Sequence, residues 1–292
     1  MDKPLFIVGL PRSGSTLWFN LITMNREIFG IGEMFFLNPW WRKDFRYFLH
    51  RSIGDLSKLE NIKKMTGLMF SGIPLPGLTA SFWRYEAKQY DKPSLKERVT
   101  DRILESDQSL QSIFKAITEE ISSYSGFDRY CAKFPVFVNY VPYLLEWYPN
   151  CKVIHIVRDP RAMAISRANF RGEKRLNNRT AMISFAVTQF IWTSRLHTKY
   201  DGMKNYALFR YEDLLANPEE TIKKLCKFAE IDFDPQMLEP GEGQASSVTG
   251  KKRGGFDTKA LSHWRDVISP MEEKVVTTLT RNSMKRFGYT LD

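Results

Sequence analysis

The sequence has few cysteines and nothing that would pair them. Cys131, Cys151 and Cys226 show neither a CxxC pair nor the spacing of metal ligands. Because their number is odd and no signal peptide is visible, we expect reduced, buried thiols and no disulfide framework. Repeats and low-complexity segments are also missing, which argues against a repeat or disordered architecture.

Long apolar runs are missing as well. The N-terminal run "LFIVGL" is far too short to cross a bilayer, and only Met1 to Pro4 precede it. It has the composition of a first strand. We therefore expect no transmembrane segment, no targeting segment and a cytoplasmic enzyme.

Basic residues outnumber acidic ones. The chain of 292 residues has 43 Lys and Arg against 33 Asp and Glu, a formal charge of +10. This charge favours an anionic partner: a nucleotide, a nucleic acid, an acidic protein or an acidic membrane surface. No nucleic-acid-binding motif is visible, so a non-catalytic nucleic-acid binder ranks last among the candidate functions and no nucleic-acid partner is expected.

Apolar runs alternate with helical patterns along the chain. Strands are predicted at residues 5–9, 130–135, 152–160 and 205–214. Unbroken apolar strands that alternate with helices predict an α/β fold, with a parallel β-sheet flanked by helices on both faces. Helix starts are predicted near Gly14, Pro142, Arg161, Asn217–Pro218 and Ser269–Pro270.

The segment from about residue 34 to residue 128 shows no clear strand. Its patterns are helical, with aromatic and basic clusters such as "MFFLNPWWRKDFRYFLHR" and "SFWRYEAKQYDK". We expect a single domain over residues 1–292, with this largely helical insertion at 34–128 packed over the sheet.

The stretch "GLPRSGST" at residues 9–16 has the layout of a phosphate-binding loop. Small residues let successive backbone N–H groups turn inward, and the following helix offers its positive end. Arg12 adds a forked cation, and Ser13, Ser15 and Thr16 add hydroxyl donors. A ligand-free turn between strand and helix is the alternative interpretation of so short a motif.

The loop lacks the lysine of nucleotide hydrolases, because Gly14 is followed directly by Ser15 and Thr16. In hydrolases that lysine reaches the β- and γ-phosphates, which Mg²⁺ bridges. No persuasive metal-binding acid follows a strand either. The loop is therefore predicted to hold a 5′-phosphate or phosphosulfate without a triphosphate and without a metal.

A second cationic stretch follows the strand at 152–160. From Arg158 to Arg179 there are seven Lys or Arg and two acids. Ser166 lies eight residues after Arg158, so two helical turns can bring both toward one oxyanion. The position directly after a buried strand favours a second phosphate site over a solvated basic helix.

Both motifs resemble those of one family. "FIVGLPRSGSTLW" resembles the 5′-phosphosulfate loop of sulfotransferases that use 3′-phosphoadenosine 5′-phosphosulfate (PAPS), and "VIHIVRDPRAMAISR" resembles their 3′-phosphate motif. The resemblance covers residues 4–40 and 130–292. It implies a P-loop-like sulfotransferase fold and transfer of a sulfuryl group from PAPS to an acceptor hydroxyl, with 3′,5′-adenosine bisphosphate as product. No γ-phosphate then needs a clamp, which accounts for the missing lysine.

The resemblance also implies which residues bind the donor. These are Arg12, Ser13, Gly14, Ser15 and Thr16 at the 5′-phosphosulfate, Arg158 and Ser166 at the 3′-phosphate, Tyr211 at the nucleotide, and Ser247, Lys252 and Arg253 in a donor-closing segment at 246–256.

The implied base is a glutamate. Many cytosolic members use a histidine two residues after a lysine, but Lys133 is followed by "FPVF". "GIGEMFFLNP" instead resembles the tyrosylprotein-type and related bacterial branch, whose base is a glutamate, and Glu33 matches it. A buried carboxylate suits this role, and an ordinary loop acid is the alternative. The histidines are interpreted as structural or surface residues: His50, His155, His197 and His263.

In the implied reaction Glu33 takes the proton, while Arg12 and Lys133 stabilise charge on the transferring group and the leaving oxygen. A nucleoside or small-molecule kinase with a degenerate phosphate loop is the alternative function. The acceptor is expected to be apolar or bound to a carrier protein, since the aromatic and basic clusters at 35–51 and 82–90 could line such a site. Those clusters could also face a membrane, and such aromatics are more often core residues, with arginines covering the surface. The sequence indicates no oligomeric state.

Overall fold

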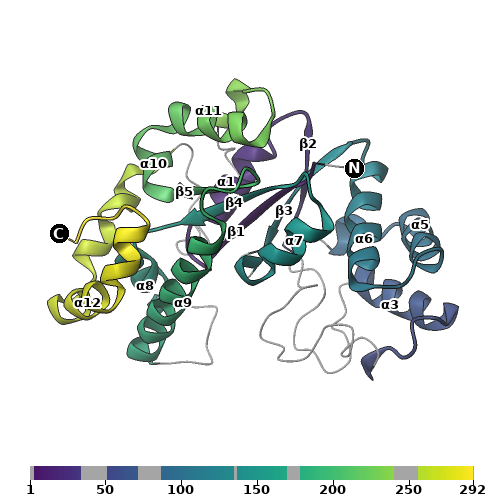
Figure 1. Ribbon diagram of the computed structural model, residues 1–292, viewed down its shortest axis with the longest axis horizontal. Coiled ribbons are helices and arrows are strands. Elements are labelled where there is room, and N and C mark those ends of the chain that lie inside the picture. The colour runs from purple at the N-terminus through teal and green to yellow at the C-terminus, as the bar shows by residue number, and fades with distance from the viewer. Residues whose placement is uncertain are drawn as a thin grey trace. The chain divides into compact units, whose positions relative to one another are not determined.

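The computed structural model describes residues 3–33, 51–71, 87–134, 137–169, 178–239 and 256–291 (Figure 1). Contacts divide the chain into two compact units. Unit 1 comprises Met1–Phe6 and Arg26–Cys151, and unit 2 comprises Ile7–Asn25 and Lys152–Asp292.

Five strands form one sheet in the order β2-β3-β1-β4-β5. Strand β2 pairs in parallel with β3, and β4 pairs in parallel with β5. Every residue of β1 is buried, as expected for a strand covered on both faces. The predicted parallel α/β architecture is confirmed. The strands are β1 (Leu5–Gly9), β2 (Ile28–Ile31), β3 (Arg129–Phe134), β4 (Lys152–Val157) and β5 (Tyr206–Arg210).

Unit 1 contains helix α6 (Leu110–Tyr124), which buries Ile113, Ile117 and Ile121 at intervals of four residues. Phe114 on the same helix packs its ring 6.3 Å from that of Phe6. The interval of four residues places the three isoleucines on one face of α6, and burial of this face stabilises the helix. The other described helices of the unit are α3 (Leu59–Ser71), α4 (Ala87–Tyr90), α5 (Pro93–Leu104), η1 (Phe137–Tyr140) and α7 (Val141–Trp147).

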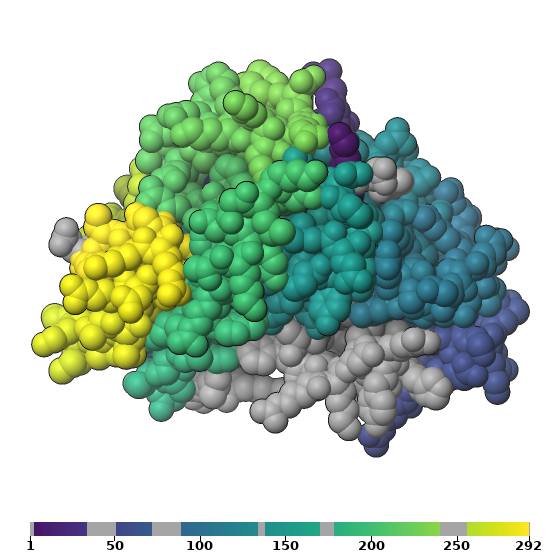
Figure 2. Space-filling model, in the orientation of Figure 1, coloured from purple at the N-terminus to yellow at the C-terminus, as the bar shows by residue number. Residues whose placement is uncertain are grey.

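Unit 2 has a core between helices α8 (Pro160–Ala168), α9 (Arg179–Tyr200) and α12 (Pro270–Arg286). Helix α12 packs along α9, and Figure 2 shows it in yellow beside α9. Its predicted start is confirmed, because Ser269 forms a capping box with Glu272. The remaining elements are α1 (Ser15–Ile22), α10 (Tyr211–Ala216), α11 (Pro218–Ala229), η2 (Pro235–Leu238), η3 (Thr258–Leu261) and η4 (His263–Asp266).

The structure corrects several local predictions. Strand β5 ends at Arg210, and residues 211–214 already belong to helix α10. Acidic side chains in the first turn, Glu212 and Asp213, favour a helix start at this point. Strand β2 was not predicted. Asn217 takes the N-cap position of α11, but its side chain makes no capping hydrogen bond.

Helices α3 to α6 lie within the segment at 34–128, where a helical pattern was predicted. Residues 34–50 and 72–86, with most of the aromatic and basic clusters, lie outside the described residues. The insertion and its acceptor role stay predictions. No helix in the described part of the chain is long and apolar enough to cross a membrane.

Candidate active site

The loop between β1 and α1 depends on glycine at position 14. Gly14 has a φ of 89° and is the N-cap of α1. A Cβ atom at this position would lie 2.2 Å from Cδ2 of Tyr211. Gly14 is thus needed both for its left-handed backbone and for the close approach of the Tyr211 ring. The packing brings Tyr211, predicted at the nucleotide, against the predicted phosphate loop.

Arg12 links the two predicted phosphate sites. Its Nε donates a hydrogen bond to Oγ of Ser166, at 3.0 Å. Its φ of 76° is unusual for a residue with a side chain. Such a backbone costs about 1 kcal/mol or more, and strain of this kind is concentrated at functional sites. The side chain of the first motif thereby meets that of the second, within unit 2.

The hydroxyl groups of the loop differ in their exposure. Ser13 and Ser15 are buried, whereas Thr16 is exposed. The buried Oγ of Ser13 has no hydrogen-bond partner within the described residues. A buried hydroxyl without a partner costs about 1–3 kcal/mol. An anion that accepts from Ser13 would remove that cost, so the loop fits a phosphate-type ligand.

Arg158 lies directly after β4, and its guanidinium stacks 4.5 Å from the ring centre of Tyr211. Its Nη2 donates to the carbonyl oxygen of Ala260 at 3.1 Å, and Nη1 lies 3.5 Å from that of Arg12. Its Nε is buried with no partner within the described residues. Burial raises the pKa of the Tyr211 hydroxyl, and nearby Arg158 counteracts part of that effect. Two arginines and the tyrosine therefore converge beside the loop.

Two other arginines of the second motif are structural. Arg161 is buried and pairs with Asp159 at 2.8 Å, while its guanidinium lies 4.8 Å from the ring centre of Trp264. Arg167 is buried and donates to Gln189 at 2.7 Å. Neither side chain belongs to a solvated basic face. Arg158 is therefore the residue of these three whose position fits a phosphate contact.

In unit 1, Glu33 and Lys133 form a buried ion pair, with 3.4 Å between Oε1 and Nζ. Their residues are 8% and 6% exposed, respectively. The parallel register aligns Ile31 with Ala132. Lys133 therefore lies near the carboxyl end of β3, and Glu33 lies two residues beyond the neighbouring end of β2. Ligands of open α/β sheets bind beyond these ends of the strands.

Three predicted residues, Ser247, Lys252 and Arg253 of the late loop, lie outside the described part of the chain. The same holds for Arg171, Lys174 and Arg175 of the cationic stretch at 158–179. Within the described residues, no group of three or more His, Cys, Asp or Glu could hold a metal ion.

The described histidines pack around Tyr206 or face the solvent. His155 and His197 are buried, and Nδ1 of each lies within 3.0 Å of the Tyr206 hydroxyl. His263 is exposed. This agrees with their interpretation as structural or surface residues, and His50 lies outside the described residues.

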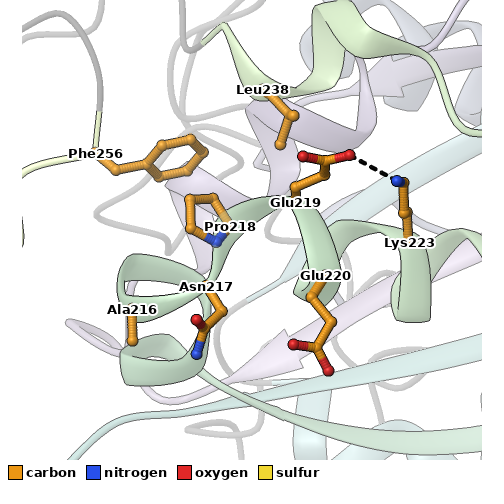
Figure 3. Close-up of a pocket in the computed structure, with 8 residues that line it drawn as sticks. All are labelled: Ala216, Asn217, Pro218, Glu219, Glu220, Lys223, Leu238 and Phe256. Atoms are coloured by element: carbon orange, nitrogen blue, oxygen red, sulfur yellow. Dashed lines mark hydrogen bonds and ion pairs between the residues drawn. The ribbon is translucent and has the colours of Figure 1, made fainter.

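A surface pocket of unit 2 lies elsewhere, at the start of α11 (Figure 3). Pro218, Leu238 and Phe256 form its apolar side, and Glu219 pairs with Lys223 at 2.6 Å. None of the predicted site residues lines this pocket. The predicted site is instead defined by contacts around the loop at 9–16.

Comparisons with known proteins identify the family of the chain. The model of the sulfotransferase family matches residues 4–235. The chain is 25% identical over 91% of its length to the omega-hydroxy-beta-dihydromenaquinone-9 sulfotransferase Stf3 of Mycobacterium bovis, and it covers 74% of that protein. It is 24% identical over 55% of its length to protein-tyrosine sulfotransferase A of Caenorhabditis elegans, covering 45% of that protein.

One relative is much longer than this chain. An uncharacterized protein of Aquifex aeolicus is 22% identical over 90% of the chain, but the chain spans only 30% of that protein's length.

Solved structures share the fold. The sulfotransferase domain from the Synechococcus PCC 7002 olefin synthase has a TM-score of 0.63 at 18% identity, and the match covers 100% of this chain and 98% of that one. Mouse sulfotransferase SULT7A1, complexed with PAP, has a TM-score of 0.55 at 12% identity, with 98% and 85% covered.

Proposed function

The chain belongs to the sulfotransferase family and is a PAPS-dependent sulfotransferase, and we propose a role for each of its site residues. Residues of unit 2 hold the donor, Glu33 takes the proton of the acceptor hydroxyl, and the acceptor is an apolar molecule.

The donor assignment follows the contacts within unit 2. Arg12 and Ser166, from different motifs, are joined by the 3.0 Å hydrogen bond between their side chains, and this observation carries the assignment. The residues proposed at the 5′-phosphosulfate are Arg12, Ser13, Gly14, Ser15 and Thr16; Arg158 and Ser166 are proposed at the 3′-phosphate and Tyr211 at the nucleotide. Ser247, Lys252 and Arg253 are proposed to close over the donor on the resemblance alone.

The reaction is an in-line transfer. The acceptor oxygen forms a bond to sulfur, the bond from sulfur to the oxygen of the 5′-phosphate breaks, and the bisphosphate leaves with that electron pair. Glu33 takes the acceptor proton, and Arg12 and Lys133 offset the negative charge that develops on the transferring group and the leaving oxygen. The buried ion pair of Glu33 with Lys133 supports this role, because it holds both side chains in fixed positions.

The acceptor proposal is supported by the degree of identity over the whole chain. The menaquinone sulfotransferase matches 91% of the chain at 25% identity, and protein-tyrosine sulfotransferase 1 of Danio rerio matches 99% at 21% identity. The higher identity favours an apolar acceptor with a free hydroxyl, presented alone or on a carrier protein, over a protein tyrosine. The three cysteines are buried and form no disulfide, which favours a reducing compartment and hence the cytoplasm.

Ligand-dependent stability tests the donor assignment. PAPS and 3′,5′-adenosine bisphosphate should raise the melting temperature of the protein, because they bind the native state. ATP with Mg²⁺ should raise it much less. Stabilisation by ATP with Mg²⁺ and none by the bisphosphate would instead support a kinase. Transfer of label from PAPS to apolar alcohols, tyrosine peptides and carrier-bound hydroxyls then identifies the acceptor class.

A further inference from the structure

The carboxylate of Glu212 joins two distant parts of unit 2. Its Oε1 accepts a hydrogen bond from the backbone N–H of Asp159 at 2.9 Å. Its Oε2 accepts from the hydroxyl of Tyr289 at 2.8 Å. Burial raises the pKa of Glu212, and the two hydrogen bonds oppose that rise. A carboxylate in this position is thus held between the start of α8 and the C-terminal segment.

The C-terminal segment is fixed where it reaches Glu212. After α12 the chain turns at Gly288, which has a φ of 73°, and the N–H of Tyr289 donates to the carbonyl oxygen of Met284 at 2.9 Å. Arg210 donates to the carbonyl oxygen of Gly288 at 2.7 Å and lies 5.6 Å from the ring centre of Tyr289. Asp213 in turn pairs with Arg210 at 2.5 Å. The phenol is therefore held in place from two sides.

Glu212 binds the backbone next to Arg158. The N–H of Asp159 belongs to the peptide group that joins Asp159 to Arg158, at the point where β4 has ended and α8 begins. The preceding residue on α10, Tyr211, stacks on the guanidinium of Arg158. Two successive residues of α10 thus fix Arg158, one through its side chain and one through its backbone.

We propose that Tyr289 and Glu212 are positioning residues that hold Arg158 in the orientation in which it binds the 3′-phosphate of the donor. This inference rests on the proposed function, which places Arg158 at the 3′-phosphate. Neither side chain touches the donor. Their effect passes through the Arg158–Asp159 peptide.

The test compares two nucleotides that differ only in the 3′-phosphate: 3′,5′-adenosine bisphosphate and adenosine 5′-monophosphate. Titration calorimetry gives both dissociation constants for the wild type, Tyr289→Phe, Glu212→Gln and Arg158→Ala. We expect Tyr289→Phe to weaken bisphosphate binding about tenfold and monophosphate binding less than twofold. Glu212→Gln should act in the same direction, because an amide presents only one acceptor oxygen.

The decisive quantity is the dissociation constant of the monophosphate divided by that of the bisphosphate. Partial unfolding weakens the binding of both nucleotides equally and leaves this ratio unchanged, whereas loss of the 3′-phosphate contact lowers it. Tyr124→Phe is the matched control, because its hydroxyl bonds Ser94 in unit 1. If Arg158→Ala lowers the ratio and Tyr289→Phe leaves it unchanged, the positioning role is wrong and the donor site stands. If Arg158→Ala itself leaves the ratio unchanged, the proposed 3′-phosphate site is wrong as well.

Discussion

The two charged sites of the molecule are built differently. Around the loop at 9–16, Arg12, Ser166, Arg158 and Tyr211 contact one another within unit 2. In unit 1, Glu33 and Lys133 meet as a buried ion pair of opposite charges. The first arrangement presents excess positive charge and suits an anion, whereas the second is balanced and suits transfer of a proton. Binding of the donor and chemistry on the acceptor should therefore be separable by mutation.

The largest separation is expected from Glu33→Gln. The amide keeps the size of the side chain but is a far weaker base. Turnover should fall about 100-fold or more, in the range typical for loss of a general base. The dissociation constant of the bisphosphate should change by less than about threefold, because Glu33 is assigned to the acceptor. Steady-state kinetics with labelled PAPS and calorimetry measure the two quantities.

Glu146→Gln is the control, because it removes an exposed carboxylate from the same unit. Near-normal turnover of Glu33→Gln would remove Glu33 from the mechanism and leave the donor assignment untouched.

On the donor side, Gly14→Ala should have the next largest effect. The added Cβ atom would lie 2.2 Å from the Tyr211 ring, so the ring must move. Strain at positive φ and overpacking together should lower the free energy of unfolding by about 3 kcal/mol. Bisphosphate binding should be lost as well, since Tyr211 and the loop shift together. Urea unfolding and calorimetry measure these effects.

Gly202→Ala is the control that separates backbone strain at positive φ from steric overlap with the Tyr211 ring. Gly202 has a φ of 82°, close to that of Gly14, but a Cβ atom there would meet nothing within 4 Å. It should cost only about 1 kcal/mol and leave binding unchanged. Equal costs for both variants would mean that the contact of Tyr211 with the loop carries no energy.

A smaller effect is expected within the donor site. Arg158→Ala should weaken the bisphosphate about 30-fold, equivalent to about 2 kcal/mol, and leave adenosine 5′-phosphosulfate almost unchanged. Ser166→Ala should weaken both ligands, because its hydroxyl also holds Arg12. Calorimetry with both ligands checks this difference. If Arg158→Ala weakened the binding of both ligands equally, the assignment of the 3′-phosphate site would be wrong.

Elements with a strong local pattern could be predicted from the sequence. The buried residues of strand β4 are apolar except for His155, and α12 begins with the Ser-Pro start that the structure shows. Strand β2 has only four residues, with glycine among them, so its stability comes from pairing with β3. Local pattern carries no signal for such a strand.

The same limit applies to the site. The loop at 9–16 and Arg158 stand in recognisable motifs. The bond between Glu212 and Tyr289 joins residues 77 positions apart. No local rule pairs them, and only the folded chain brings them together. Arg12 and Ser166 are 154 positions apart. The sequence predicts the two motifs in which they stand, but not the contact between their side chains.

Strand β4, which ends directly before Arg158, carries a buried histidine. Burial lowers the pKa of His155 on β4 to about 3, and it also lowers the pKa of His197 on α9. The unfolded chain has a histidine pKa of about 6.5, so it binds more protons than the folded chain between these values. Stability is therefore full above pH 6.5 and falls as the pH drops. His155 alone should remove about 1.2 kcal/mol between pH 7 and pH 5.5.

Urea unfolding at the two pH values measures this loss. His155→Asn removes the titrating ring, so its stability should depend less on pH by that amount, whatever its absolute stability. His263→Gln is the control, because this side chain is exposed and should leave the dependence unchanged. If His155→Asn keeps the full pH dependence, the buried ring does not couple protons to folding. The acid sensitivity of unit 2 would then have to come from its carboxylates, such as Glu272, whose pKa Arg179 lowers to about 2.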